Sequence, residues 1–234
     1  MSIRELVARR DDLSTFVVHL TRDYGGSSAR TNLESIVRDG AILARSGIGQ
    51  AVSRLREAGL PTESQKCVCF TETPLQHMHL LLGSIEGREV SLEPYGVAIT
   101  KRIARGNSVN PVWYIDMTVG HDWLTVPLDE MIDDEIESGR FDESRLARLT
   151  PYMEQMGTWE NSRKEFWWER EWRHHGDFTL PPHYIGLCPS GEIGAFEDLA
   201  GSCGRPAHFI DPRWCLEEII GRLAGFDADE VLLL

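Results

Sequence analysis

The sequence predicts a mixed α+β fold, and three observations support this class. Short β-type runs such as 15–21 (TFVVHLT) and 66–71 (KCVCFT) stand among segments with helical periodicity. The strands and helices do not alternate with the βαβ rhythm of a doubly wound sheet. No internal repeat and no clear linker divides the chain. We therefore expect a single α+β domain over residues 1–234.

One helix carries explicit start and stop signals. Thr31-Asn32-Leu33-Glu34 matches a capping box, in which the threonine oxygen accepts an amide of the first turn and the glutamate reaches back. A helical stripe of apolar residues follows, and Gly40 is expected to end the helix. A glycine- and serine-rich patch at 25–28 precedes it and predicts a flexible loop.

The other elements follow from hydrophobic period and from turn residues. In chain order they are a helix at 3–13, a strand at 15–21, a helix at 48–58, a strand at 66–71, a helix at 75–83, strands at 95–100 and 112–117, helices at 127–139 and 142–156, strands at 166–173, 184–187 and 208–210, and a helix from 211 to about 225. The two acidic helices make 127–157 the best candidate for a helical insertion.

The composition bounds the function. Hydrophobic residues make up 41% and charged residues 26%, which is typical of a globular protein and excludes disordered and fibrous classes. The net charge of −13 argues against broad nucleic-acid binding, because that mode needs a basic footprint. The five cysteines lack framework or ligand spacing, which predicts reduced thiols and no metal site. Without a leader-like segment or a long apolar run, we expect a cytoplasmic protein that does not bind membranes.

Polar residues at the end of the first strand form one candidate site. His19 and Thr21 share a face, because side chains alternate along a strand. Together they could hydrogen-bond a ribose or an amide, and the helix that follows offers free amides to a phosphate. The alternative is a strand-end histidine that bonds to the backbone.

A second candidate lies where later strands end. The strand at 66–71 finishes at Thr71, at a sheet rim. In 164–173 a two-residue alternation places Glu169, Glu171 and Arg173 on one face, with the carboxylates about 7 Å apart. One of them could hold a substrate hydroxyl. Two alternatives stay open: the first half of the segment is helical, or Glu171 and Arg173 form a structural ion pair.

The order of these motifs resembles two families. H-x-T followed by N-L-x-x-I-x-x-x-G is similar to the start of DarT-type ADP-ribosyltransferases. V-C-F-T-E-T-P, the Tyr95-Gly96 strand, the 110–114 segment (NPVWY) and E-x-E-W-R-H resemble AbiGi-type abortive phage infection proteins over most of residues 15–180.

These resemblances imply an ADP-ribosyltransferase-like split β-sheet core with peripheral helices, which takes NAD as its substrate and needs no metal. Loss of nicotinamide builds positive charge at the ribose, and a nearby carboxylate stabilises that charge. The implied catalytic residues are His19, Thr71, Glu169 and Glu171. The implied NAD-binding residues are His19, Thr21, Asn32, Tyr114 and Arg173, with Trp113 and Trp167 as further aromatic walls.

Three functions are therefore carried forward. The first is a phage-defence toxin or effector that transfers ADP-ribose from NAD to an acceptor, which could be protein, RNA, DNA or a nucleotide. The second, also implied by the AbiGi-type resemblance, is a non-catalytic antitoxin or regulatory partner of an abortive-infection pair. In both, the expected protein partner is a cognate toxin or antitoxin. The third is a nuclease or other hydrolase built on the Glu and His residues.

Overall fold

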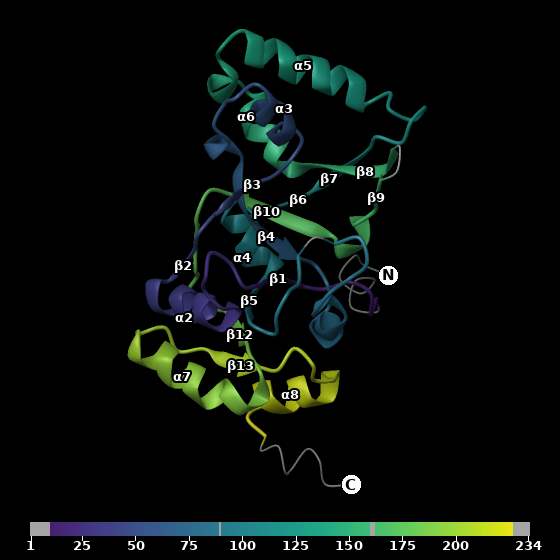
Figure 1. The fold of residues 1–234 in the computed structure, drawn as a ribbon. Coiled ribbons are helices and arrows are strands. Elements are labelled where there is room, and N and C mark those ends of the chain that lie inside the picture. The colour runs from purple at the N-terminus through teal and green to yellow at the C-terminus, as the bar shows by residue number, and fades with distance from the viewer. Residues whose placement is uncertain (1–9, 89, 160–161, 227–234) are drawn as a thin grey trace. The chain divides into compact units, whose positions relative to one another are not determined.

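The computed structural model describes residues 10–88, 90–159 and 162–226 (Figure 1). The chain is mixed α+β, as predicted, and contains a multi-strand mixed sheet. It divides into two compact units. Unit 1 comprises Met1–Ala41, Thr71–Ala104 and Thr179–Leu234, and unit 2 comprises Ile42–Phe70 and Arg105–Phe178. The helix predicted at 3–13 falls almost entirely outside the described residues.

The strands of unit 1 run in the order β13-β12-β5-β1. Their bounds are β1 (Phe16–Leu20), β5 (Gly96–Thr100), β12 (Ile185–Leu187) and β13 (His208–Ile210). β1 and β5 are antiparallel and pair over their full length, from Phe16↔Thr100 to Leu20↔Gly96. β12 pairs antiparallel with β5 and parallel with β13. Each of these four strands lies within two residues of its predicted range.

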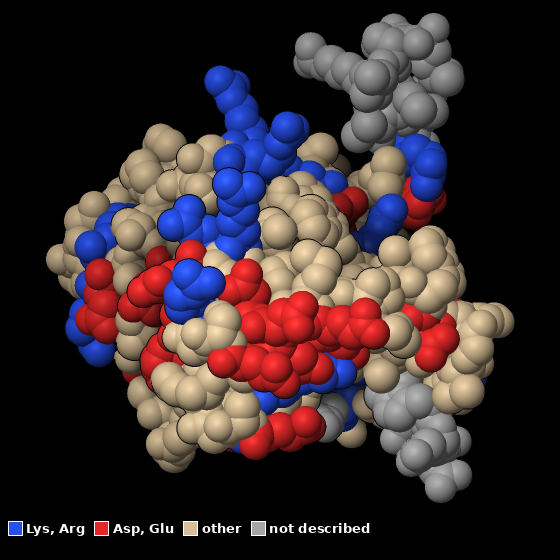
Figure 2. Space-filling view, turned by 90° about the horizontal axis from the view of Figure 1, so that it is seen from above, with Lys and Arg blue, Asp and Glu red and all other residues tan. Residues whose placement is uncertain are grey.

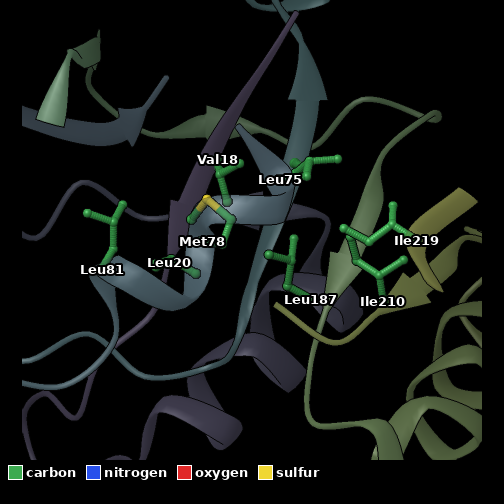
Figure 3. Close-up of a cluster of buried hydrophobic side chains, with 9 residues drawn as sticks. Val18, Leu20, Leu75, Met78, Leu81, Leu187, Ile210 and Ile219 are labelled. Carbon is green, nitrogen blue, oxygen red and sulfur yellow. The ribbon is translucent and has the colours of Figure 1, made fainter. Parts of the chain in front are cut away.

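The helices of unit 1 pack on these strands and on one another. They are α2 (Ala29–Asp39), α7 (Ile193–Ser202), α8 (Leu216–Ala224) and the 3-10 helices η2 (Leu75–Leu81) and η6 (Ser190–Glu192). A core cluster fills the space between η2, α8 and the strands, and Figure 3 shows how its side chains converge. Its members are Val18, Leu20, Leu75, Met78, Leu81, Ala98, Leu187, Ile210 and Ile219.

The start of α2 differs from the predicted capping box. Ser28, not Thr31, is the N-cap: its backbone is extended and its hydroxyl accepts the Thr31 amide at 3.1 Å. The helix therefore begins one turn earlier than Thr31 predicts. Its predicted end is confirmed, because Gly40 takes the left-handed conformation (φ 68) and its amide bonds to Ile36 O at 2.9 Å.

The strands of unit 2 form a sheet and a separate three-stranded ladder. The sheet has β4 (Lys66–Thr71, whose last residue belongs to unit 1), β10 (Glu171–His175) and β6 (Asn110–Pro111) in that order, with β3 (Ser46–Gly47) paired to β4. The ladder is β7 (Trp113–Asp116), β8 (Met153–Trp159) and β9 (Ser162–Lys164), in which β7 and β8 are parallel. The strand predicted at 66–71 is confirmed as β4.

The helices of unit 2 surround a smaller core. They are α3 (Val52–Glu57), α5 (Thr125–Glu137), α6 (Leu146–Leu149) and the 3-10 helices η1 (Glu63–Gln65), η3 (Phe141–Glu143), η4 (Thr150–Tyr152) and η5 (Trp167–Glu169). Ile132 of α5 packs there with Leu55 of α3 and Leu146 of α6. Three short elements straddle the division between the units: β2 (Ala41–Ile42), α4 (Lys101–Gly106) and β11 (Phe178–Thr179).

The segment 127–157 is helical only in part. α5 confirms the first acidic helix, but the helix predicted at 142–156 is confirmed only over 146–152, as α6 and η4, and is wrong from Met153 onward. Pro151 has no amide hydrogen to continue α6, so the chain tightens into η4, and Met153 then starts a strand that pairs in register with Trp113. No helix in the described part of the chain is both long enough and apolar enough to cross a bilayer.

The close approach of β5 to β1 yields a test of this register. A Cβ on Gly96 would lie 2.3 Å from the carbonyl oxygen of His19, which is backbone and cannot swing away. We expect Gly96→Ala to lower the free energy of unfolding by about 1–3 kcal/mol, as overpacking does, in urea denaturation. The matched control is Gly194→Ala in α7, where no heavy atom lies within 4 Å of the new methyl group. Gly194→Ala should not lower the free energy of unfolding. An equal loss of unfolding free energy in the two variants would contradict the register.

Candidate functional site

Strand β10 begins later than the sequence predicts, and this decides which residues share a face. The strand predicted at 166–173 is wrong in its first half, which forms η5. Arg170 then takes a left-handed conformation (φ 49, ψ 55) that breaks the two-residue alternation. Only from Glu171 onward is the chain extended. Glu171 and Arg173 therefore share a face as predicted, but Glu169 does not belong to that strand face.

Arg173 is the centre of a buried ionic cluster. Its side chain is only 3% exposed. Its Nε donates to Glu171 Oε1 at 3.0 Å and its Nη2 donates to Glu171 Oε2 at 2.8 Å, a bidentate pair. Nη2 also contacts Glu154 Oε2, and Nη1 donates to the carbonyl of Pro151 at 2.8 Å. Most donors of the guanidinium are thereby used inside unit 2.

Glu154 links this arginine to a second cation. Its other oxygen contacts Nζ of Lys164. Burial alone would raise the pKa of Glu154, but the charges of Arg173 and Lys164 outweigh burial and lower that pKa. Burial likewise opposes the charge of Arg173, but Glu171 and Glu154 raise the pKa of its guanidinium. Two carboxylates and two cations thus balance in one place, which we call the Arg173 cluster.

Uncharged groups complete the Arg173 cluster. The Glu171 amide donates to Oη of Tyr114 at 3.0 Å, and burial raises the pKa of that phenol. Burial raises the pKa of Cys69, and the adjacent Glu171 carboxylate, with which the thiol hydrogen-bonds, raises it further. Burial also raises the pKa of Cys67 to about 12. Both thiols are therefore protonated at neutral pH and are poor nucleophiles.

The other predicted residues of unit 2 are Glu169, Trp113 and Trp167. Glu169 ends η5, where its amide bonds to Phe166 O at 2.9 Å. Trp113 and Trp167, expected as aromatic walls, are about half exposed to solvent, at 48% and 56%. Of the three aromatic residues predicted there, Tyr114 is the one that hydrogen-bonds to the cluster.

In unit 1 the hydroxyl of Thr21 hydrogen-bonds to backbone carbonyls. Thr21 is buried, and its Oγ1 donates to Ala29 O at 2.9 Å and to Tyr95 O at 3.1 Å. The predicted role of Thr21 in binding a nicotinamide ribose would require it to leave these carbonyls. Because a bond to a ligand would only replace bonds that the hydroxyl already makes, the geometry favours a structural role.

Asn32 acts at the other end of the same loop. It is buried in α2, and its Nδ2 donates to the carbonyl of Arg22 at 2.8 Å. Thr21 and Asn32 together fix both ends of the 22–29 loop. The sequence pattern could not distinguish this anchoring from ligand binding, because both use the same polar groups.

The loop itself encloses a small open hollow. Tyr24 and Ser27 exchange backbone hydrogen bonds of 2.9 and 3.0 Å, and Gly25 and Gly26 turn the chain with φ of 59° and 83°. Asp23 accepts the Ala29 amide at 2.7 Å. A hollow of about 440 Å³ is lined by Asp23, Tyr24, Gly25, Gly26, Ser27 and Ser28.

The other predicted residues of unit 1 lie on or after strands. His19 is half-buried on β1, opposite Val97 of β5. Thr71 pairs with Val18 at the end of β4, and its hydroxyl lies 2.9 Å from that of Thr73. The four residues His19, Thr21, Asn32 and Thr71 thus belong to unit 1, whereas Tyr114, Glu169, Glu171 and Arg173 belong to unit 2.

Some polar groups of both units escaped the sequence analysis. In unit 1, Glu192 accepts from Arg30 at 2.6 Å and from the Tyr95 hydroxyl at 2.8 Å. In unit 2, Glu154 and Lys164 join the Arg173 cluster from β8 and β9. No local motif marks these residues, because their partners are distant in sequence.

Within the described ranges, no group of three or more His, Cys, Asp and Glu is arranged to hold a metal ion. The five cysteines all lie in described residues, and no disulfide joins them.

Comparison of the chain with family models, curated proteins and solved structures finds no match.

The lowered pKa of Glu154 predicts how stability depends on pH. A carboxylate whose pKa is lowered by folding stabilises the protein above its ordinary pKa, about 4.5, and this contribution is lost as the pH falls through the folded value. We expect Glu154→Gln to cost about 1–3 kcal/mol of unfolding free energy near pH 7, measured by urea denaturation. The difference from the wild-type protein should shrink as the pH is lowered below about 4.5.

The control is Glu165→Gln, which removes a carboxylate from an exposed ion pair with Arg163. Exposed pairs contribute at most about 1 kcal/mol, so this variant should change little at any pH. A loss in Glu154→Gln that is constant from neutral to acidic pH would show that charge is not the cause.

Proposed function

We propose that the chain is a non-catalytic binding partner in an abortive-infection pair, and that the Arg173 cluster stabilises its fold. The observation that carries this proposal is the bidentate pair between Glu171 and Arg173. Glu171 is the carboxylate that an ADP-ribosyltransferase would need at the ribose 2′-hydroxyl. Here both of its oxygens accept from a guanidinium that is almost fully buried.

The hydrogen-bonding capacity of Glu171 supports this reading. A carboxylate offers about four lone-pair sites. Arg173 occupies two of them, and the Cys69 thiol hydrogen-bonds to the same carboxylate. Roughly one site is left for a substrate. Removal of either Glu171 or Arg173 would leave the charge of the other without compensation, so the pair is well suited to a structural role.

The predicted NAD contacts in unit 1 point the same way. The Thr21 hydroxyl and the Asn32 amide both donate to backbone carbonyls of the loop that they anchor. Polar groups already bonded in this way gain little from a ligand, because each new bond replaces an existing one. The context of phage defence, the split-sheet core and a cognate toxin or antitoxin as partner come from the resemblance to AbiGi-type proteins.

A second function keeps one specific observation in its favour. The Glu171 side chain retains 19% exposure, and Arg173 holds it in a fixed orientation. A carboxylate that is oriented before the substrate arrives stabilises a developing positive charge without reorganising. In this reading the chain is a transferase that uses NAD as a substrate and transfers ADP-ribose to an acceptor whose class is open.

Glu171→Gln separates the two functions, because it keeps the shape and removes the charge. For the non-catalytic partner we expect a lower melting temperature, by several degrees, since a charged hydrogen bond contributes about 1.5–3 kcal/mol and each kcal/mol shifts a chain of this size by about 2–4 °C. Nicotinamide release from NAD, with cell lysate as the acceptor source, should stay at background for the wild-type protein and for Glu171→Gln. A thermal melt and a nicotinamide assay measure the two effects.

Glu165→Gln serves again as the matched control, because it removes one carboxylate from an exposed pair. It should leave the melting temperature within about 2 °C of the wild-type value. Turnover of NAD by the wild-type protein that Glu171→Gln abolishes, with an unchanged melt, would contradict the non-catalytic proposal and establish the transferase.

A further inference from the structure

The outward side of helix α5 carries large apolar side chains in solvent. Trp123, just before the helix, is 74% exposed, and Leu124, Val126 and Met131 are each about half exposed. The Val126 amide bonds to Asp122 O at 3.0 Å, so the first helical turn extends back over Trp123. Residues three and four apart are neighbours on a helix, and Trp123, Pro127 and Met131 therefore form one row. Isolated exposed apolar residues need no explanation, but a contiguous group indicates an interaction site.

The orientation of α5 is fixed by its other side. Ile132 is fully buried, and Leu128 and Ile136 pack against the same core. Two of the acids are also used within unit 2, because Arg54 pairs with Asp129 at 2.9 Å and with Asp133. What remains is a face with no internal role, which we call the α5 outer face. Its residues are Trp123, Leu124, Val126, Pro127, Glu130, Met131, Asp134 and Glu137.

The acidic residues of the α5 outer face lie at positions that destabilise the helix. Glu130, Asp134 and Glu137 are exposed, and no ion pair joins them to another residue in the described ranges. Asp134 and Glu137 lie in the last turn of α5, where the helix favours cations, and that turn holds no basic residue. Glu130 and Asp134 are four apart and repel each other. A helix selected only for stability would not carry this arrangement.

The charge of the α5 outer face limits what can bind there. Figure 2 looks onto the side where α5 lies and shows acidic side chains gathered in a band. Segment 122–143 holds nine acidic residues and a single arginine. Phosphate backbones and anionic lipid surfaces are repelled by such a field. The apolar row next to the acids calls for a partner that buries Trp123 and Met131 and brings cations to the rim.

We propose that the α5 outer face binds a basic protein, whose apolar surface covers Trp123 and Met131 and whose Arg and Lys side chains meet Glu130, Asp134 and Glu137. This inference rests on the proposed function, since it assigns the surface through which a regulatory partner is held. Exposed tryptophan is among the residues that contribute most when buried at an interface. The acids then supply orientation and a fast, salt-dependent association.

The test uses a defined probe, a fluorescent amphipathic helical peptide of about 18 residues built from Leu and Lys, whose length corresponds to about five turns. Fluorescence anisotropy measures its affinity for the full chain. Replacing both Trp123 and Met131 by Ala should weaken binding about tenfold, as loss of a hot-spot residue does. The matched control replaces Leu216 and Ile220 by Ala, two apolar residues of α8 that are about half exposed, and should bind like the wild-type protein.

A second pair of variants tests the charges. Replacing Glu130 by Gln and Asp134 by Asn should also weaken binding several-fold, and only at low salt, because screening removes the contribution. Asp142→Asn with Glu143→Gln makes the same charge change at exposed positions of η3, and should leave the affinity unchanged. Thermal melts of all four variants establish that they fold.

Several results would overturn the proposal. One is equal affinity of the peptide for the wild-type protein and for the Trp123 and Met131 double variant. Another is equal binding of a peptide in which every Lys is replaced by Gln. Dimerisation of the wild-type chain that the double variant abolishes would assign the face to a second copy instead. Failure of the non-catalytic function is seen separately, in the nicotinamide assay on the wild-type protein and Glu171→Gln, which uses no variant of the α5 outer face.

Discussion

The guanidinium of Arg173 lies almost fully out of water, and burial of a cation is costly unless opposite charges and hydrogen-bond acceptors surround it. Unit 2 supplies them from three elements: Glu171 on β10 itself, Glu154 on β8, and the Pro151 carbonyl in η4. These elements must keep their relative places for the charge to stay compensated. The ion network therefore ties the sheet of unit 2 to its three-stranded ladder.

Polar side chains in unit 1 likewise hold chain segments in place, through fewer bonds. Thr21 and Asn32 each give a side-chain donor to a carbonyl of the same loop. In both units, residues that resemble a binding site when read along the sequence turn out to satisfy buried protein groups. A strand-end threonine or a glutamate two residues before an arginine suits either purpose, and only the spatial neighbours decide between them.

Local signals in the sequence were sufficient for much of the fold. The β-branched and apolar run of β4 and the left-handed Gly40 at the end of α2 depend on residues adjacent in the chain. The misplaced elements depend on more distant contacts. Met153 begins a strand because β7 offers a parallel partner. Arg170 interrupts the expected strand through a conformation that an arginine seldom adopts.

The same distinction applies to the candidate site. The shared face of Glu171 and Arg173 follows from strand alternation alone, so the sequence was enough to place them together. Glu154 is 19 residues from Arg173 and has no motif around it. Its contribution could not be predicted, because it arises from the packing of β8 against β10. The partial burial of Cys69 beside Glu171, which raises the pKa of its thiol, could not be predicted for the same reason.

The turn at Gly25 and Gly26 has a practical consequence. No atom lies within 4 Å of a Cβ built on either glycine, and the loop is clamped behind them by the Tyr24–Ser27 hydrogen bonds. The tip is thus mechanically isolated from β1 and from the cap of α2. A short epitope or a fluorophore-binding peptide spliced between these glycines would be displayed in solvent while the strand and helix on either side keep their contacts.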